Sequence, residues 1–183
     1  GQKRWSDVIK SIVAKAEIHV DPAKKVELYA EAGQMYLDKS SNQAEAIKCY
    51  EAILEHDPQN LEAIQQLKEM YEKRRDWESL VRIRQRAAKM MDEADRLFEA
   101  VEIAQLATKR LRKPDICIEL WQDVLAEDED NPEALEALSQ LYERSRDWEP
   151  LAKVLDKRVD QIDDEKELKQ ALQKLGMIYA DKL

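Results

Sequence analysis

Glycine, proline and cysteine are scarce in this chain of 183 residues, and long apolar runs are missing. Three glycines and five prolines leave few points at which a helix has to break, so the composition favours a mostly helical chain. No apolar run approaches the roughly 20 residues that a membrane-spanning helix needs, which excludes membrane insertion. The net charge of −9 argues against nucleic acid as a partner, because phosphate contacts need a basic surface.

Residue types that carry most catalytic and metal chemistry are also sparse. Cys49 and Cys117 stand far apart in no redox or metal-ligand spacing, and we expect both to be small core residues of helices. His19 and His56 are isolated, and no glycine-rich phosphate loop can be recognised. The sequence therefore predicts a protein that is not an enzyme and needs no metal or cofactor. Without a disulfide framework we expect a cytoplasmic location, with the periplasm as the alternative.

What the chain does contain is an internal repeat. The segment Arg75-Asp76-Trp77-Glu78-Ser79-Leu80 returns seventy-one residues later as Arg146-Asp147-Trp148-Glu149-Pro150-Leu151. The match continues over residues 46–80 and 117–151 without a gap. Such self-similarity is typical of a fold that stacks one unit repeatedly.

Apolar residues recur at the three-four spacing of amphipathic helices throughout the chain. Strand signals such as alternating apolar residues and Asn-Gly turns are missing, so we predict an all-α fold. The short connections predict antiparallel hairpins. The ten expected helices span residues 5–20, 22–39, 43–56, 60–74, 76–91, 93–111, 114–127, 131–145, 147–162 and 164–182.

Residues of helix-starting type precede several of these helices. Asp21, Asp76, Asn131 and Asp147 are expected to act as N-caps, whose side chains accept hydrogen bonds from the first free backbone N–H groups. Pro150 falls in the first turn of its helix, where a missing N–H is tolerated.

One stretch carries a family pattern. Ala32-Gly33-x-x-Tyr36, Ala46-x-x-x-Tyr50 and Asp57-Pro58-x-Asn60 resemble the tetratricopeptide repeat (TPR), although Ala32 replaces the usual leucine and the loop at 40–43 is one residue longer. The resemblance implies a right-handed superhelical α-solenoid in which the first helix of each repeat, helix A, lines an inner groove. It implies a single TPR-like solenoid over 1–183, with a helix B at 5–20, repeats at about 22–59, 60–92, 93–130 and 131–163, and a helix A at 164–182.

The two glycines after residue 1 sharpen the register. Gly33-x-x-Tyr36-x-Asp38-Lys39 recurs after 143 residues as Gly176-x-x-Tyr179-x-Asp181-Lys182, and Trp5 precedes Trp148 by the same distance. The longer period is therefore four helices. Because the chain opens on a helix B and closes on a helix A, we expect an internal fragment of a longer degenerate array, with apolar surface open at both ends.

Four tryptophans and one arginine stand out from the pattern. Trp5, Trp77 and Trp148 share one repeat position and Trp121 aligns with a tyrosine, so we expect all four to pack in the core. Arg84 aligns with apolar residues, so it must extend to solvent or pair with a carboxylate. Together with its neighbouring arginines it could instead form a docking patch, and this alternative stays open.

The resemblance also places a set of polar residues on the inner faces of the A helices. The lysine and asparagines with which some family members clamp a carboxylate tail are missing there, and glutamates predominate, which favours a basic or mixed-charge peptide or helix as the partner. The same glutamates could simply stabilise helix N-termini. The expected groove residues are Glu27, Gln34, Glu62, Gln65, Glu69, Glu99, Glu102, Glu133, Glu136 and Gln140.

Two functions follow from this reading. The first is a non-catalytic protein-interaction scaffold that binds a peptide or helix of a partner protein in the acidic concave groove. The alternative is a structural spacer or assembly element that contacts partners, or a second copy, through its open ends or its convex face.

Overall fold

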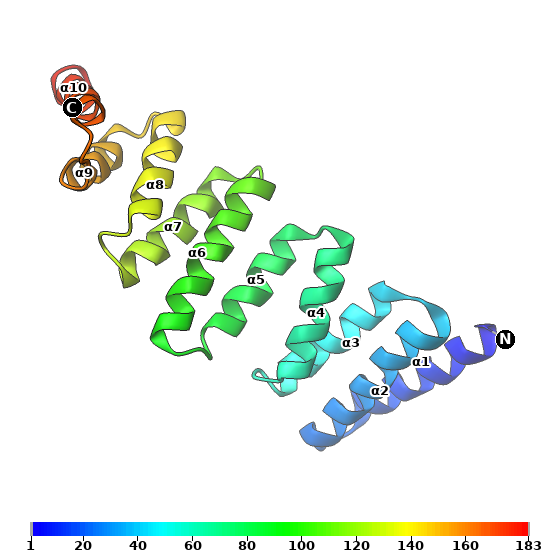
Figure 1. The fold of residues 1–183 in the computed structure, drawn as a ribbon. Helices are drawn as coiled ribbons and strands as arrows, with labels where there is room; N and C mark the ends of the chain where they lie inside the picture. The colour runs from blue at the N-terminus through cyan, green and yellow to red at the C-terminus, as the bar shows by residue number, and fades with distance from the viewer. Residues whose placement is uncertain (1, 183) are drawn as a thin grey trace. The chain divides into compact units, whose positions relative to one another are not determined.

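The computed structural model describes residues 2–182, with side chains from Arg4 onward, and this range contains ten α-helices and no strand (Figure 1). All ten helices predicted from the sequence are confirmed, with ends that differ from the prediction by three residues at most. The helices are α1 (Gln2–Ile18), α2 (Pro22–Ser40), α3 (Gln43–His56), α4 (Leu61–Arg74), α5 (Trp77–Ala88), α6 (Glu93–Arg110), α7 (Pro114–Glu127), α8 (Pro132–Ser145), α9 (Trp148–Val159) and α10 (Glu165–Asp181).

The chain divides into two compact units, residues 1–91 and residues 92–183. The first contains α1 to α5 and the second contains α6 to α10, and within each unit every helix packs against the next one. In the repeat register, α2, α4, α6, α8 and α10 are A helices and the others are B helices. That the ten helices form one continuous right-handed solenoid stays a prediction.

All four predicted residues occupy N-cap positions, and three of them make the side-chain hydrogen bond of a cap. The side chains of Asp21, Asp76 and Asn131 each accept a hydrogen bond from a backbone N–H in the first turn of the following helix. The bond from the Ser79 N–H to Asp76 Oδ1 is 3.2 Å long. Each such cap satisfies one of the N–H groups that have no partner inside the helix.

Asp147 occupies the N-cap position of α9 as predicted, but its side chain makes no cap hydrogen bond. The reason lies three residues further along the chain. Pro150 occupies the position of Ser79 in the repeat, and proline has no N–H to donate to the aspartate. The same proline that suits the first turn of α9 therefore removes the donor that its cap would use.

The repeated segment that begins at Arg75 and at Arg146 is a tight turn between helices A and B. Both arginines adopt left-handed backbone conformations, with φ of 55° and 59°. In each turn the next residue donates its N–H to a carbonyl of the preceding helix, as Asp76 does to Tyr71 at 2.9 Å. This hydrogen bond ends helix A, and the aspartate then begins helix B.

Residues at defined positions of the repeat make contacts between consecutive helices. A Cβ placed on Gly33 of α2 would lie 3.0 Å from the ring of Tyr50 on α3, so these helices approach closely where a side chain is missing. Tyr71 of α4 donates its hydroxyl to Glu51 of α3 at 2.6 Å. Burial, and then this hydrogen bond to a carboxylate, raises the pKa of Tyr71.

Between α7 and α8 the equivalent pair is bonded in the opposite direction, because Gln122 donates to the hydroxyl of Tyr142 at 2.7 Å. Both arrangements join a helix B to the next helix A through the same tyrosine position. The apolar core is otherwise made of aliphatic and small residues, among which Ile53, Leu67, Ile103, Val124, Leu135, Leu138 and Leu151 are almost completely buried.

Candidate functional site

The ten residues expected to line a groove all lie on A helices, in α2, α4, α6 and α8. Three of them, Glu99, Glu102 and Glu136, are half-buried. The exposed ones are Glu27, Gln34, Glu62, Gln65, Glu69, Glu133 and Gln140.

In the first unit the expected residues make local contacts along their own helices. Lys24 donates to Glu27 at 2.5 Å on α2, and this hydrogen bond, more than the charge of the glutamate, raises the pKa of the lysine. On α4, Gln65 donates to Glu69 at 2.9 Å. Glu62 stands in the first turn of α4, where a carboxylate also stabilises the helix N-terminus. These exposed contacts leave the carboxylates accessible to a partner.

In the second unit the side chains of two A helices meet. Gln105 of α6 donates to Glu133 of α8 at 2.5 Å. Beside this contact lies a shallow depression of about 390 Å³. Its lining contains three of the expected groove residues together with polar and apolar neighbours, namely Gln105, Trp121, Pro132, Glu133, Glu136, Ala137 and Gln140. The structure thus brings together the α8 residues that the sequence singled out.

A charged network extends from this depression to the next two helices. Arg158 of α9 forms ion pairs with Glu136 and, at 3.0 Å, with Glu167 of α10. Gln140 donates to the other carboxylate oxygen of Glu136 at 2.6 Å. Arg158 therefore neutralises part of the acidic surface, and Glu133 is left as the more available carboxylate of α8. Sequence reasoning missed Arg158 because no local pattern on α9 indicates which residue of α8 it will face.

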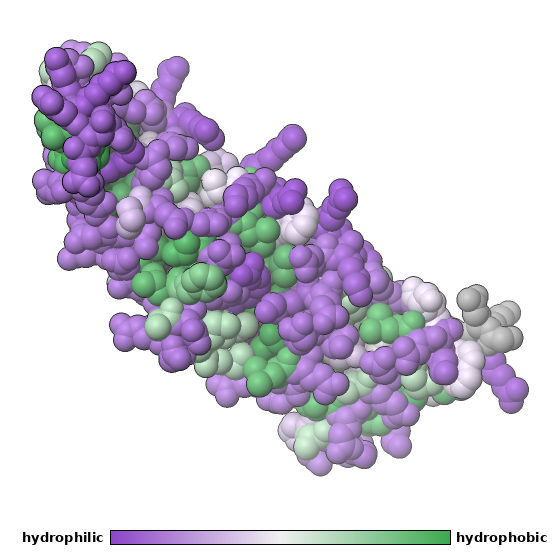
Figure 2. Space-filling model, in the orientation of Figure 1, coloured by the Kyte–Doolittle hydropathy of each residue, from purple (hydrophilic) through white to green (hydrophobic). Residues whose placement is uncertain are grey.

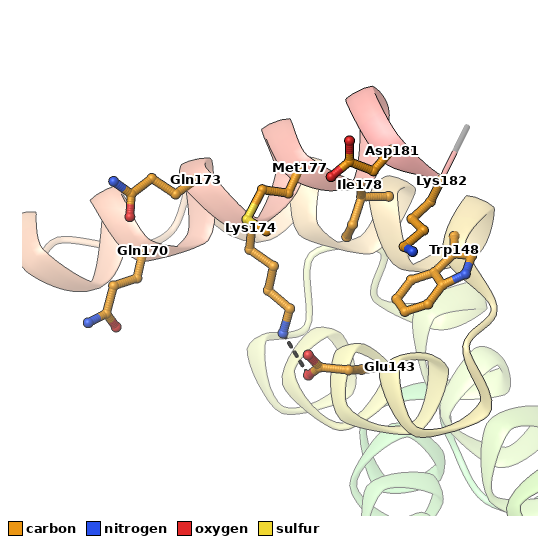
Figure 3. Close-up of a pocket in the computed structure, with 9 residues that line it drawn as sticks. All are labelled: Glu143, Trp148, Gln170, Gln173, Lys174, Met177, Ile178, Asp181 and Lys182. Atoms are coloured by element: carbon orange, nitrogen blue, oxygen red, sulfur yellow. Dashed lines mark hydrogen bonds and ion pairs between the residues drawn. The ribbon is translucent and has the colours of Figure 1, made fainter.

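A second depression, of about 470 Å³, has α10 on one side and the end of α8 and the start of α9 on the other (Figure 3). Trp148, Met177 and Ile178 give it an apolar surface, and Lys174 reaches from α10 to Glu143 on α8 at 2.6 Å across it. Sequence reasoning did not predict this site. One signal in the sequence could have indicated it. Trp148 lies 143 residues after the equivalent residue of α1, and the end of α10 lies 143 residues after the end of α2.

The four tryptophans differ in burial. Trp121 is 3% exposed and packs in the core as predicted. Trp77 and Trp148 are half-buried, and Trp5 is 41% exposed, so the prediction of a core position is wrong for Trp5. It lies on α1 beside Val8, which is also exposed.

Lysines of the next helix A cover the two outer tryptophans. The ammonium of Lys39 lies 5.5 Å from the ring centroid of Trp5, and that of Lys182 lies 5.6 Å from the ring of Trp148. Both are cation–π contacts. The repeat position of these tryptophans was predicted to lie in the core. In the structure it lies partly at the surface, where helix B contacts the following helix A.

The cysteines and histidines show no catalytic arrangement within the described range. Cys49 and Cys117 are buried as predicted, and burial raises the pKa of the Cys49 thiol to about 11, away from the reactive range. His56 ends α3 and stacks on Tyr29, with 6.3 Å between ring centroids. Among residues 2–182 no group of three or more potential ligand side chains could hold a metal ion.

The arginines of α5 have structural contacts. Arg86 donates to the carbonyl oxygens of Leu54 and Pro58 at 2.9 and 3.1 Å, which satisfies free carbonyls around the end of α3. Arg82 donates to Ser79 on its own helix, and Arg84 is half-buried. Arg86 thus acts in the packing of the first unit, and a docking role for this patch stays a hypothesis.

Hydrophilic residues predominate on the face drawn in Figure 2, with hydrophobic ones in interrupted patches. Within the part of the chain that the structure describes, no helix combines the length and apolar character that crossing a membrane requires.

No protein-family model matches this chain, and no curated protein matches it either. Solved structures do resemble it. The crystal structure of MamA is 15% identical, with a TM-score of 0.40 over 94% of this chain and 87% of MamA. PilF of Pseudomonas aeruginosa is 12% identical, with a TM-score of 0.47 over 99% of this chain and 85% of PilF. YrrB, described as a TPR protein with an unusual peptide-binding site, is 18% identical, with a TM-score of 0.42 over 94% of this chain and 88% of YrrB.

The succession of paired helices fits the TPR resemblance of the motif residues. Paired A and B helices were predicted from the sequence, and the structure adds the close contact of Gly33 with Tyr50. The A helices contribute most of the lining of two depressions in the second unit, one lined by α6, α8 and Trp121 of α7 and the other by α8, α10 and Trp148 of α9. We therefore regard the helix A faces as the candidate binding surface.

Proposed function

We propose that the chain is a non-catalytic interaction scaffold whose A helices bind a basic or mixed-charge peptide or helix of a partner protein. The observation that carries the proposal is the depression between α6 and α8. It combines an acidic rim at Glu133 with hydrogen-bonding amides at Gln105 and Gln140 and an apolar patch at Trp121 and Ala137. A peptide site needs these three kinds of contact.

The charge of the rim sets the expected partner. Glu133 is exposed and accepts a hydrogen bond from the neutral amide of Gln105, which leaves its negative charge in place. Lysine or arginine side chains of a partner would supply that compensation. Glu102 on α6 and Glu62 on α4 are further acidic residues on the A helices of the second and the first unit.

The test uses a labelled amphipathic helical peptide rich in lysine and arginine, and a matched peptide with glutamate at each basic position. Replacing Glu62, Glu102 and Glu133 together by lysine should weaken binding of the basic peptide by about tenfold or more. The control replaces Glu55, Glu119 and Asp123, exposed residues of the B helices α3 and α7, by lysine and so makes the same change in net charge. Fluorescence anisotropy at physiological salt measures both variants.

Two results would refute the groove proposal. One is an equal loss of affinity in the groove and control variants, which would mean that net charge alone attracts the peptide. The other is equal binding of the basic and acidic peptides by the unmodified chain. A loss confined to the groove variant supports the proposal.

Exposed apolar residues favour a second candidate function, assembly through helix faces. Trp5 and Val8 of α1 are 41% and 42% exposed, and Leu172 and Tyr179 of α10 are 49% and 50% exposed. Association that these faces drive would be visible as a concentration-dependent mass in sedimentation. A mass that stays monomeric at every accessible concentration would refute self-assembly.

A further inference from the structure

A third depression of the second unit, of about 330 Å³, is rimmed by positive charge. It lies where α6 ends, α7 begins and α8 ends. Among the described residues that line it, three carry a positive charge and none carries a negative one. The cations are Arg112, Lys113 and Arg144, all exposed, and the apolar part contains Leu111, Pro114 and Leu141. A chain with a net charge of −9 therefore has a local site of the opposite sign.

One of the three cations, Arg144, is explained by its own helix. It stands in the last turn of α8, where a positive charge stabilises the helix C-terminus. The carboxylate next to it in the sequence, Glu143, pairs with Lys174 of α10 at 2.6 Å. Glu143 is thus engaged on the side of α8 that faces α10 (Figure 3).

Arg112 and Lys113 are not explained in this way. They immediately precede α7, whose N-terminus is the positive end of the helix dipole, so two cations there disfavour the helix. Lys113 is the N-cap residue of α7, and its side chain makes no cap hydrogen bond. From α2 to α10, every other helix begins after an aspartate or an asparagine.

The first unit shows which residues the repeat has at the same positions. Seventy-one residues before Arg112 and Lys113 stand Ser41 and Asn42. The Asn42 side chain accepts a hydrogen bond from the Glu45 N–H at 3.2 Å and so caps α3. The second unit has two cations where the first has a neutral cap, at a cost to the start of α7. Departures from local helix rules are expected where residues serve a function.

We propose that this depression binds an acidic segment of a partner protein that carries one large apolar side chain between carboxylates. The apolar side chain would lie against Leu111 and Leu141, and the carboxylates would meet the cations of the rim. A carboxylate beside Lys113 would also face the positive end of α7. An inorganic anion would use the cations but leave the apolar surface without a contact.

The most acidic turn of a second copy would fit this site less well. Residues 127–133 contain five acidic residues and no basic one. Two of these carboxylates are already compensated, because Glu127 pairs with Arg96 at 2.8 Å and Glu129 pairs with Lys157 at 3.1 Å. The turn also has no large apolar residue that could enter the depression. A separate acidic partner therefore matches the site better than this turn does.

The basic depression is separate from the acidic groove proposed above. Glu133 stands at the start of α8 and Arg144 at its end, which places them roughly 16 Å apart along the helix. This distance is about twice the Debye length at physiological salt, so a charge change at one site should leave binding at the other unchanged.

The probe is a labelled peptide with one phenylalanine between two blocks of three aspartates, which is too short to form a stable helix. We expect saturable one-to-one binding to the full chain by fluorescence anisotropy at physiological salt. The double variant Arg112→Ser with Lys113→Asn introduces the residues of the first unit and should weaken binding by about tenfold or more. Its thermal midpoint should rise by about 2–4 °C, because α7 gains a capping side chain and loses two unfavourable charges. A fall in the midpoint together with lost binding would overturn the proposal, because the cations would then stabilise the turn itself.

The matched control is Lys166→Ser with Lys169→Asn, which removes the same charge from exposed positions of α10. It should bind the peptide like the unmodified chain. Equal weakening in this control would overturn the proposal, because net charge alone would then attract the peptide. Equal binding of a peptide with serine in place of phenylalanine would overturn the apolar contact.

Two further measurements separate this site from the alternatives. Self-association of the chain that Arg112→Ser with Lys113→Asn abolishes would overturn the choice of a separate partner. The lysine substitutions at Glu62, Glu102 and Glu133 should leave binding of the acidic peptide unchanged, and a loss of binding there would overturn the placement of the site. Because the groove is tested with a basic peptide, the two proposals can fail independently.

Discussion

Helices α2 and α10 share the local sequence Gly-x-x-Tyr-x-Asp-Lys but have different surroundings. In α2 the glycine is covered by a tyrosine ring and the tyrosine of the motif is 5% exposed. In α10 the glycine faces open space and the tyrosine is 50% exposed. The comparison teaches that the repeat sequence specifies a face, whereas a neighbouring helix decides whether that face is core or surface.

The turns at Asp76 and Asp147 give the same lesson on a smaller scale. Both aspartates begin a B helix after a left-handed arginine, yet only Asp76 accepts a cap hydrogen bond. The difference comes from a single neighbour, Ser79 in one turn and Pro150 in the other.

The largest effect should come from removing the ring that covers α2. Tyr50→Ala is expected to lower the free energy of unfolding by about 3–5 kcal/mol, because it empties a nearly completely buried site. Tyr179→Ala, at a half-exposed position of α10, should cost less than about 1 kcal/mol. Urea unfolding of the two variants measures both values, and similar costs would contradict the covered-versus-open contrast.

Filling the two glycines should produce effects of opposite sign. Gly33→Gln is expected to destabilise by about 2–4 kcal/mol, because the side chain must displace Tyr50 and bury an amide. Gly176→Gln should stabilise by up to about 1 kcal/mol, because glycine is a poor helix former and the new side chain reaches solvent. Thermal unfolding followed by circular dichroism compares the pair, and destabilisation of both variants would mean that α10 is covered in solution.

The smallest effect concerns the caps. Asp76→Ala should cost about 1 kcal/mol, whereas Asp147→Ala should cost only a few tenths because it removes no cap hydrogen bond. Repeating the second change in a Pro150→Ser background, where a donor N–H is restored, should raise its cost to that of Asp76→Ala. Equal costs of Asp147→Ala in the two backgrounds would show that proline is not the cause.

Much of the fold could be predicted from the sequence because its signals are local. The three-four spacing of apolar residues and the residues that begin and end helices depend only on neighbours within a few positions. That is why ten helices were placed within three residues and why the caps at Asp21, Asp76 and Asn131 were predicted. The missing cap hydrogen bond at Asp147 also has a local cause, since the proline that removes the donor stands in the same turn.

The candidate site could be predicted only in part. The register of the A helices indicated Glu133, Glu136 and Gln140, and these residues do line one depression. The ion pair of Glu136 with Arg158 links two different helices, and the second depression lies between α8 and α10. Such contacts depend on how far one helix is rotated and shifted against another, which a helical period does not specify.

By itself the sequence determined that this protein is a succession of amphipathic helices with a four-helix period and an acidic helix A register. Only the tertiary structure decided that Trp5 is a partly exposed residue covered by Lys39, that Arg158 compensates Glu136, and that Gly176 is open where Gly33 is filled. The physical reason is that local periodicity selects the apolar side of a helix, while burial and charge compensation require a second helix at a definite distance.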